Sequence, residues 1–449
     1  MTKIDKRLVA IISLGAIFIF ALGLRLYPVI MYPETLRYGM GEFGDSFVYN
    51  DIAFHLYKFK GFSCSDEASV IPDEKAAFKP AITRGPGYPF FLFLVYRLFG
   101  SENSMDKLSW YQNWNKVRIA QCFLDAVICL LVFAIVRCIY PASFLPALIS
   151  AILYCFSFYN IYYTRTLLSE SLATFLLTLS IFSYIRSLKQ DSRIWLISSG
   201  ICFGLTILTR PEYLLLPLAL TLPIYLSHRQ DLTLAVKKSI LFMASAIIIV
   251  APWTLRNYIV FKKIIPVSTG SLGYSLYLGT FEGNQQWLGW GHLPEDVMSD
   301  NENREKLMAL YKKWDDGMYA GGIGVKEADA KFMNLAIERI RKNFFLCSKS
   351  WFKSAPRLWY QNYIPMYLEK EASGGFFLFY FFFALYGLLI VQRKEKILIA
   401  AVFITFVYMV VIFFPLHIEP RYSVSLMPFF IFIAGIGLCK FWRYLKERF

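Results

Sequence analysis

Charged residues are scarce in this 449-residue chain. Asp, Glu, Lys and Arg together make up only 18% of it, whereas 57% of the residues are hydrophobic. A water-soluble domain of this composition would aggregate, so the balance excludes an ordinary soluble protein and indicates a polytopic membrane protein. The net charge of +15 is then explained by Lys and Arg that fix the membrane topology, and no nucleic-acid partner is predicted.

Motifs for nucleotides and metals are missing. No GxxxxGK[ST] loop occurs, which argues against direct use of a cytoplasmic nucleotide. The eight cysteines include no CxxC pair and form no metal-type pattern with the four histidines, so no cofactor is predicted, although a divalent cation stays open. Only Cys64 and Cys347 fall in long polar segments, where an oxidising compartment would permit one disulfide.

Long apolar runs, in contrast, are abundant. A spanning helix needs about 20 apolar residues, and we predict ten spans, at 8–30, 117–138, 142–162, 167–186, 194–209, 212–227, 239–258, 376–392, 397–416 and 422–439. The first follows MTKIDKR without a small-residue cleavage site, so we expect it to be retained. The run at 86–100 is shorter and contains Arg97, which is typical of an interfacial or re-entrant segment.

Basic residues predict the orientation of these spans. If 86–100 does not cross, Lys and Arg gather in one set of connections, namely the N-terminus, the loops around 137, 186–193, 229–238 and 393–396, and the tail from 440. The positive-inside rule then places both termini in the cytoplasm. The predicted organisation is a first span (1–30), a first outer segment with interfacial helices (31–116), a membrane core (117–258), a large outer segment (259–375) and the last spans (376–449). The large outer segment should contain one amphipathic helix near 326–346.

Five arginines break this rule because they lie on the outer side. They are Arg84 (ITRGPGYP), Arg165 (YYTRTLLSE), Arg210 (LTRPEY), Arg256 (PWTLRNY) and Arg421 (HIEPRYSV). Snorkelling to lipid headgroups would explain any single one. A cluster of guanidiniums instead matches a phosphate or pyrophosphate, whose oxygens the planar fork binds in pairs. We therefore predict that these arginines bind the phosphate of a lipid-linked molecule, with Tyr88, Glu419 and Tyr422 as neighbouring site candidates.

Carboxylates share the outer side. In GDSFVYNDIAFHL, residues 44–56, a helix opened by Asp45 would carry one apolar stripe at positions 48, 49, 52, 53 and 56 and would lie on the membrane. Asp45 is then either a capping residue or a catalytic base at the interface. Asp51 lies off the stripe and is expected to be solvated or structural. Glu170 lies just inside an apolar helix, where a carboxylate needs a partner; this is either Arg165 or a group in a cavity.

Arginines for a phosphate and one or two carboxylates are the parts needed to transfer a sugar from a polyprenyl-phosphate donor. One carboxylate takes the proton of the acceptor hydroxyl, and cations stabilise the departing phosphate, where charge develops. Single displacement with inversion is expected. Two alternatives stay open: a transporter or flippase of lipid-linked glycans, which should show inverted repeats that are not visible here, and an O-antigen-type polymerase or ligase, which would not require the first-segment acid. The partners are the lipid-linked sugar, membrane lipids and an acceptor that is a lipid, a glycan or a protein.

The order and spacing of several stretches carry a family resemblance. The stretches are RLYPVI leading to GDSFVYNDIAFHL, RGPGYPFFLFLVYRLFG, RIAQCFLDAVICLLVFAIVRCIY, SFYNIYYTRTLLSESLATFLL, GLTILTRPEYLLLPLAL, APWTLRNYIVFKKIIPVSTGSLGYSLYLG and EPRYSVSLMPFF. Together they resemble the GT-C membrane glycosyltransferases, in particular the bacterial relatives of protein O-mannosyltransferases and lipid A aminoarabinose transferases. The resemblance covers most of the chain outside 285–370.

That resemblance implies an all-α GT-C fold with about ten transmembrane helices in a prokaryotic inner membrane. It implies that Asp45 is the catalytic base and Glu170 the second acidic position, and that Arg84 and Arg421 meet the donor phosphate. Two departures leave the substrate open. Asp45 is followed by Ser46, where protein mannosyltransferases tend to have a second acid, and residues 84–86 read Arg-Gly-Pro, where aminoarabinose transferases have Lys-Pro-Pro.

Overall fold

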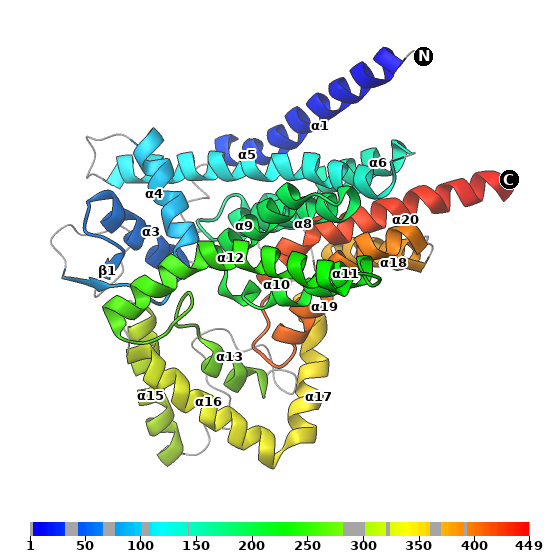
Figure 1. The fold of residues 1–449 in the computed structure, drawn as a ribbon. Coiled ribbons are helices and arrows are strands. Elements are labelled where there is room, and N and C mark those ends of the chain that lie inside the picture. The colour runs from blue at the N-terminus through cyan, green and yellow to red at the C-terminus, as the bar shows by residue number, and fades with distance from the viewer. Residues whose placement is uncertain are drawn as a thin grey trace.

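A computed structural model of the chain describes residues 3–31, 44–65, 77–100, 107–141, 143–281, 301–319, 324–359, 370–389 and 393–448 (Figure 1). These residues are almost wholly helical, and their one sheet is an antiparallel pair of short strands, β1 (Ser63–Ser65) and β2 (Phe78–Pro80). Both ends of the chain lie at the same end of the molecule, where α1 and α20 project from the body. The all-α class that the family resemblance implied is confirmed.

Six helices in the described part of the chain contain segments long and apolar enough to cross a membrane. They are α1 (Lys3–Met31), α5 (Lys107–Ile139), α8 (Glu170–Gln190), α12 (Leu232–Phe261), α19 (Arg393–Phe413) and α20 (Met427–Arg448). The other predicted spans contain shorter apolar helical segments: α6 (Leu145–Cys155), α9 (Arg193–Thr209), the stretch Pro211–Ser227 that ends in α11 (Thr221–Ser227), and Leu378–Leu389 of α18 (Lys370–Leu389). The interfacial candidate is α4 (Gly87–Phe99), also short. The chain is a multi-pass membrane protein.

Two of the predicted spans are broken for different local reasons. Residues 212–227 form η1 (Pro211–Tyr213), α10 (Leu216–Ala219) and α11, because Pro211, Pro217 and Pro223 lack the amide protons that a continuous helix needs. Residues 142–162 form α6 and α7 (Phe158–Tyr163), which are separated where Ser157 adopts an extended backbone. Hydropathy alone detects neither break.

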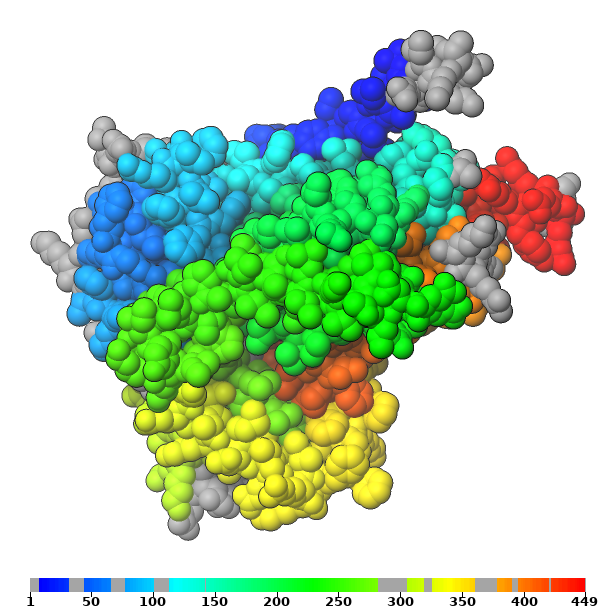
Figure 2. Space-filling view, viewed as in Figure 1, coloured from blue at the N-terminus to red at the C-terminus, as the bar shows by residue number. Residues whose placement is uncertain are grey.

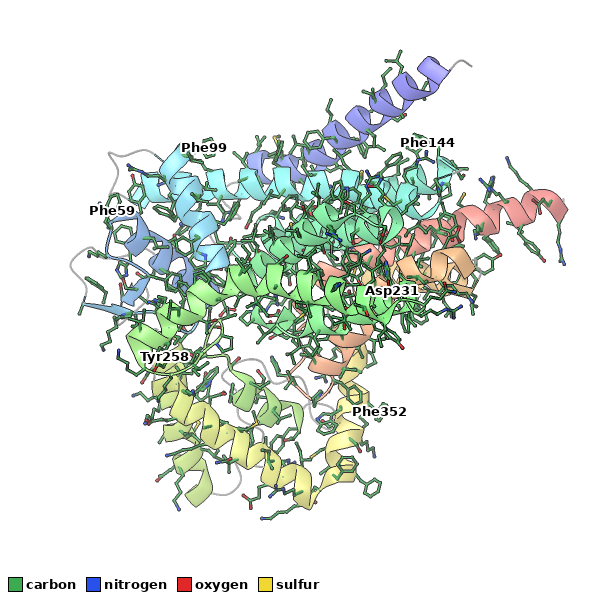
Figure 3. All side chains as sticks on the ribbon, in the orientation of Figure 1. Phe59, Phe99, Phe144, Asp231, Tyr258 and Phe352 are labelled. Atoms are coloured by element: carbon green, nitrogen blue, oxygen red, sulfur yellow. The ribbon has the colours of Figure 1, made fainter. Side chains whose placement is uncertain are left out.

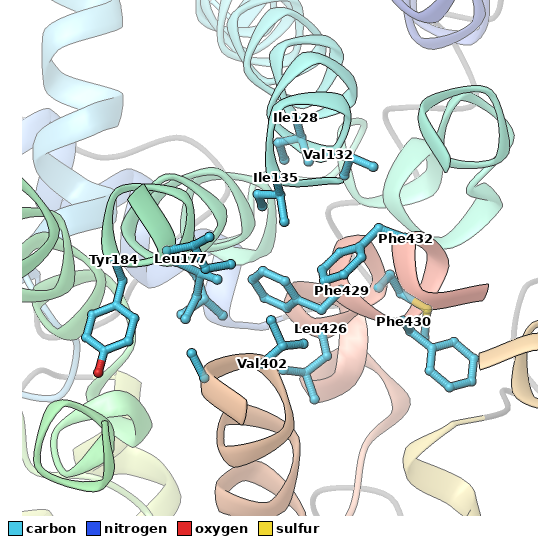
Figure 4. Close-up of a cluster of buried hydrophobic side chains, with 14 of the residues drawn as sticks. Ile128, Val132, Ile135, Leu177, Tyr184, Val402, Leu426, Phe429, Phe430 and Phe432 are labelled. Atoms are coloured by element: carbon cyan, nitrogen blue, oxygen red, sulfur yellow. The ribbon is translucent and has the colours of Figure 1, made fainter. Parts of the chain in front are cut away.

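The core of the bundle lies between α5, α8 and α20. Ile128, Val132 and Ile135 of α5 point toward Leu177 of α8 and Phe429 of α20 (Figure 4). The helices α9, α12, α18 and α6 surround this core, whereas α1 packs mainly against α5 and buries only 17% of its most apolar segment. The bundle therefore has a dense centre and a first helix that is held at its edge.

A buried ion pair holds that first helix. Arg25 of α1 is fully buried and its Nε donates to Asp125 of α5, which also accepts a hydrogen bond of 2.7 Å from the Tyr154 hydroxyl of α6. Arg25 Nη1 donates to the carbonyl oxygen of Cys155 at 3.2 Å. A charge buried at this depth needs such a partner, so the pair fixes α1 against α5 and α6.

The described residues between α12 and α18 form a lobe beside the bundle (Figure 2). It contains α13 (Leu272–Gly279), α15 (Asn301–Tyr319), α16 (Gly324–Lys342), α17 (Phe344–Ser354) and η2 (Ala355–Leu358). The lobe has its own core, in which Tyr274 packs against Trp314 and Phe332. The amphipathic helix predicted near 326–346 is confirmed as α16, whose buried positions 325, 328, 332 and 336 follow helical spacing.

The segment between α1 and α5 contains α3 (Gly44–Tyr57), which is buried on two sides. Val48 and Ile52 pack against a cluster around β1, while Tyr49 and Phe54 pack against a second cluster with α4 and α5. The prediction of one apolar stripe is therefore wrong. The reason is that α3 lies between two protein surfaces, and a single-sided pattern cannot describe a helix buried on both sides.

Asp51 explains how α3 is joined to the strands. It is fully buried, and its carboxylate accepts hydrogen bonds from Ser65 N at 2.6 Å and from the Ser65 hydroxyl at 2.9 Å. The structural alternative for Asp51 is thus confirmed and the solvated one is wrong. The cysteines of the two outer segments, Cys64 in β1 and Cys347 in α17, are both buried and are not joined in a disulfide.

Candidate functional site

Asp45 lies in the first turn of α3 and is held by two arginines from distant parts of the chain. Its Oδ1 accepts from Arg84 Nη2 at 2.5 Å, and its Oδ2 accepts from Arg421 Nη1 at 2.9 Å. The Asp45 side chain keeps 28% of its accessible surface, against 11% and 12% for the arginines. The carboxylate is therefore the accessible member of a largely buried triad.

Two glycines bring Arg84 to this place. A Cβ atom on Gly85 would lie 2.4 Å from the carbonyl oxygen of Leu208, and one on Gly87 would lie 2.4 Å from the Thr209 hydroxyl. Any larger residue would push the turn away from the end of α9. The motif RGPGYP therefore seats Arg84 against the end of α9, which Arg210 follows directly.

Arg210 lies between two carboxylates. Its Nη1 is 3.0 Å from Glu170 Oε1, and its Nε donates to Glu212 at 2.5 Å. Glu170 begins α8 and its side chain is only 2% exposed. Arg210, from the end of α9, is therefore an ion-pair partner of Glu170. The second oxygen, Oε2, has no hydrogen-bond partner among the described residues, so Glu170 retains an acceptor at the site.

Arg421 and Tyr422 join the two halves. Arg421 lies in η3 (Pro420–Leu426), where its Nε also binds Glu419, whose other oxygen is 3.4 Å from His417 Nε2. The ring of Tyr422 lies 5.6 Å from the Arg421 guanidinium and 5.8 Å from that of Arg210, within the range of cation–π contact. We call this set the arginine–carboxylate cluster: Asp45, Arg84, Glu170, Arg210, Glu212, Glu419 and Arg421.

Neighbouring cations keep Asp45 and Glu419 ionised. Burial alone would raise the pKa of Asp45, but the charges of Arg84 and Arg421 outweigh it and hold that pKa well below its ordinary value. Burial likewise opposes ionisation of Glu419, and Arg421 and His417 lower its pKa overall. At neutral pH Asp45 is therefore a carboxylate bound by two cations. It can accept a proton only after those cations are engaged elsewhere.

Three of the predicted site residues have other contacts. Arg256 of α12 donates to the carbonyl oxygens of Ala81 at 2.8 Å and Phe62 at 2.9 Å, so it fastens the segment that precedes Arg84. The Tyr88 hydroxyl is buried and donates to Gln121 at 2.8 Å. Arg165 lies between α7 and α8, where its carbonyl oxygen accepts from Arg118 at 2.8 Å.

His417 is a member of the site that sequence reasoning did not predict. It is 1% exposed and contacts Glu419, which has an extended backbone. Alternate residues of an extended segment point to the same side. The alternation of His417 and Glu419 in HIEPR was therefore a readable signal. No group of three or more His, Cys, Asp and Glu side chains in the described ranges is arranged to hold a metal ion.

Comparisons with known proteins bear on the fold and on family similarity. Residues 83–255 match the family described as dolichyl-phosphate-mannose-protein mannosyltransferase. No curated protein sequence gave a match to the chain. Among solved structures, the oligosaccharyltransferase AglB from Archaeoglobus fulgidus, in complex with an inhibitory peptide and a dolichol-phosphate, is similar with a TM-score of 0.56 and 12% identity, over 99% of this chain and 52% of that one.

Two further structures extend the comparison. The A. fulgidus oligosaccharyltransferase tethered with an acceptor peptide gives a TM-score of 0.56 at 12% identity, over 98% of this chain and 50% of that one. ArnT from Cupriavidus metallidurans in the apo state gives 0.32 at 14% identity, over 87% and 72%. The chain spans about half the length of the archaeal enzymes.

The class of protein is now defined. The chain has the GT-C fold of membrane glycosyltransferases, as its sequence resemblance predicted. Within that class it is similar to the mannosyltransferase family over residues 83–255, which include Arg84, Glu170 and Arg210.

Proposed function

We propose that the protein transfers a sugar from a polyprenyl-phosphate donor to an acceptor hydroxyl or phosphate, with Asp45 as the general base. The observation that carries this proposal is the binding of one accessible carboxylate by two arginines that converge from opposite ends of the chain. A neighbour of the same fold is in complex with dolichol-phosphate, which supports a lipid-linked donor.

The donor phosphate competes with Asp45 for Arg84 and Arg421. Each guanidinium can bind phosphate oxygens in pairs, so the entering phosphate displaces the carboxylate. Asp45 then loses two counter-ions, and its pKa rises toward the ordinary value of about 4. Donor binding thus converts a charge-paired carboxylate into a base.

The chemical step follows from this exchange. The acceptor oxygen attacks the anomeric carbon on the face opposite the phosphate, and Asp45 takes its proton. The bond between the anomeric carbon and the phosphate oxygen breaks, and its electron pair remains on the polyprenyl phosphate. Arg84 and Arg421 stabilise that developing charge. The configuration at the anomeric carbon is inverted.

The remaining residues have supporting roles in this proposal. Glu170 orients Arg210. Glu419 and His417 hold Arg421 in place. We assign the cluster to the extracytoplasmic side and both termini to the cytoplasm, on the basis of the positive-inside rule.

The decisive test uses the purified full chain in nanodiscs with a radiolabelled polyprenyl-phosphate sugar. R84Q and R421Q should raise the KM for the donor and weaken binding of undecaprenyl phosphate. R256Q is the matched control, because Arg256 binds backbone carbonyls: it should lower thermal stability and leave the donor KM near the wild-type value. Equal donor KM values for wild type, R84Q and R421Q would refute the proposal.

The acceptor and the sugar require a cellular experiment. The glycan and lipid profile of a deletion strain should lack one sugar addition, and the wild-type gene should restore it. A flippase would instead translocate the lipid in proteoliposomes without releasing polyprenyl phosphate, and D45N would not abolish that movement.

A further inference from the structure

A second charged region lies at the far end of α8, the helix whose first residue, Glu170, belongs to the candidate site. Glu170 starts α8, and Arg186 and Lys189 lie in its last turns. At 1.5 Å per residue, Glu170 and Arg186 are about 24 Å apart along the helix. The ring centroids of Phe144 and Phe133 of α5 are 5.3 Å apart. Phe144 lies at the opposite end of the molecule from Phe59 and Phe99 (Figure 3). This end is separate from the arginine–carboxylate cluster.

A cavity of about 380 Å³ opens here between α1, α5 and α8. Its apolar wall includes Leu14 of α1, Phe133 of α5 and Phe182 of α8, and its basic wall consists of Arg137, Arg186 and Lys189. The volume is in the range of ligand sites, roughly 300–1,000 Å³. Arg137 follows Phe133 by four residues, and Arg186 follows Phe182 by four. Each basic residue therefore stands one turn beyond an aromatic ring on the same helix face.

The three cations have no carboxylate partner within the described ranges. Arg137 donates to the carbonyl oxygens of Pro141 at 2.7 Å and Ser143 at 3.0 Å, and Lys189 Nζ donates to that of Cys138. The Arg186 guanidinium lies 5.2 Å from the Trp195 ring, and its Nε has no hydrogen-bond partner among the described residues. Three positive charges thus border an apolar cavity, and none of them is neutralised by an ion pair in the described protein.

We propose that this cavity binds an anionic phospholipid, with an acyl chain between α1, α5 and α8 and the phosphate at Arg137, Arg186 and Lys189. Apolar residues deeper along each helix and cations at the helix ends match the two parts of such a lipid. Basic pockets between transmembrane helices bind anionic headgroups for this reason. Topology-setting lysines and arginines alone would not require a cavity lined by aromatic side chains behind them.

Native mass spectrometry of the full chain in detergent tests the proposal, with phosphatidylglycerol and phosphatidylcholine of the same acyl chains as probes. Phosphatidylglycerol should bind more tightly than phosphatidylcholine. The double variant R186Q/K189Q should weaken its binding by about 30-fold, as expected for the loss of two charges. R193Q is the matched control, because Arg193 begins α9 close to the end of α8, is exposed and does not line the cavity.

A second variant separates the tail from the headgroup. A134W fills the apolar side of the cavity and should weaken binding of diacyl phosphatidylglycerol while leaving the charges intact. R186K/K189R retains both charges and should bind as wild type does, which controls for misfolding. The proposal is overturned if R186Q/K189Q binds phosphatidylglycerol like R193Q, if both lipids bind equally to the wild type, or if inorganic phosphate at equal concentration displaces the lipid.

Discussion

The substitution D45N should separate catalysis from donor binding. It removes the proposed base while keeping the shape of the side chain and one acceptor oxygen. General-base catalysis contributes about 10²- to 10⁴-fold, so kcat should fall by that factor. The donor KM should also fall, because the phosphate no longer has to displace a carboxylate from Arg84 and Arg421.

The size of the second effect follows from the contacts. Asp45 accepts one charge-assisted hydrogen bond from each arginine, and each such bond contributes about 1.5–3 kcal/mol. The side-chain amide introduced by D45N would keep one neutral bond, and the site is partly exposed, so we take the lower limit of one bond. The donor KM and the dissociation constant of undecaprenyl phosphate should therefore fall about tenfold.

The assay is transfer of label from a polyprenyl-phosphate sugar by nanodisc-embedded protein, with binding of undecaprenyl phosphate measured in parallel. D51N is the matched control, because the Asp51 carboxylate anchors α3 to Ser65 and binds neither arginine. It should lower the melting temperature and leave the kcat of the folded fraction near the wild-type value. Wild-type kcat in D45N, or a higher donor KM, would refute the assignment of the base.

Three further predictions concern stability. The pKa of Asp45 is depressed in the folded state, so its contribution is fully present above pH 5 and lost as pH falls below about 4; the difference in melting temperature between wild type and D45N should be constant from about pH 8 to about pH 5 and should shrink at lower pH. R25A leaves Asp125 buried without its cation and should cost about 3–5 kcal/mol; denaturation in detergent should show this loss, and R25L/D125L should recover most of it. D329A removes the acceptor for Gly273 N and Tyr274 N at the start of α13 and should cost about 1–2 kcal/mol; hydrogen exchange should rise in α13, and D329N should retain most of the protection.

Much of the architecture was predictable because hydropathy and charge act locally. The apolar runs predicted the long helices, and the outer position of Arg84, Arg210 and Arg421 predicted three cations that the fold brings together. Gly85 and Gly87 lie in the motif RGPGYP, and both are needed because the backbone there closely approaches the end of α9.

Partners that lie far apart in the sequence could not be predicted. Asp45 and Arg421 are 376 residues apart, and no local pattern pairs them. Glu170 was assigned Arg165 as an alternative partner because the two are neighbours in sequence, whereas the packing of α8 against α9 gives it Arg210. The burial of α3 on two sides also depends on β1, whose residues follow the helix in the sequence and are not part of its own pattern.

The ion pair of α1 also bears on how the chain is made. Arg25 leaves the ribosome 100 residues before Asp125, and α1 has little other burial to hold it. During that interval the first helix must insert by its own hydropathy while it carries an unmatched cation, a state that costs at most about 2.5–3.5 kcal/mol, the value for a charge at the bilayer centre. The arrival of α5 in the membrane removes this cost, so α1 becomes committed to the bundle only when α5 inserts. Synthesis therefore passes through a stage at which the first helix is in the bilayer but not yet part of the protein.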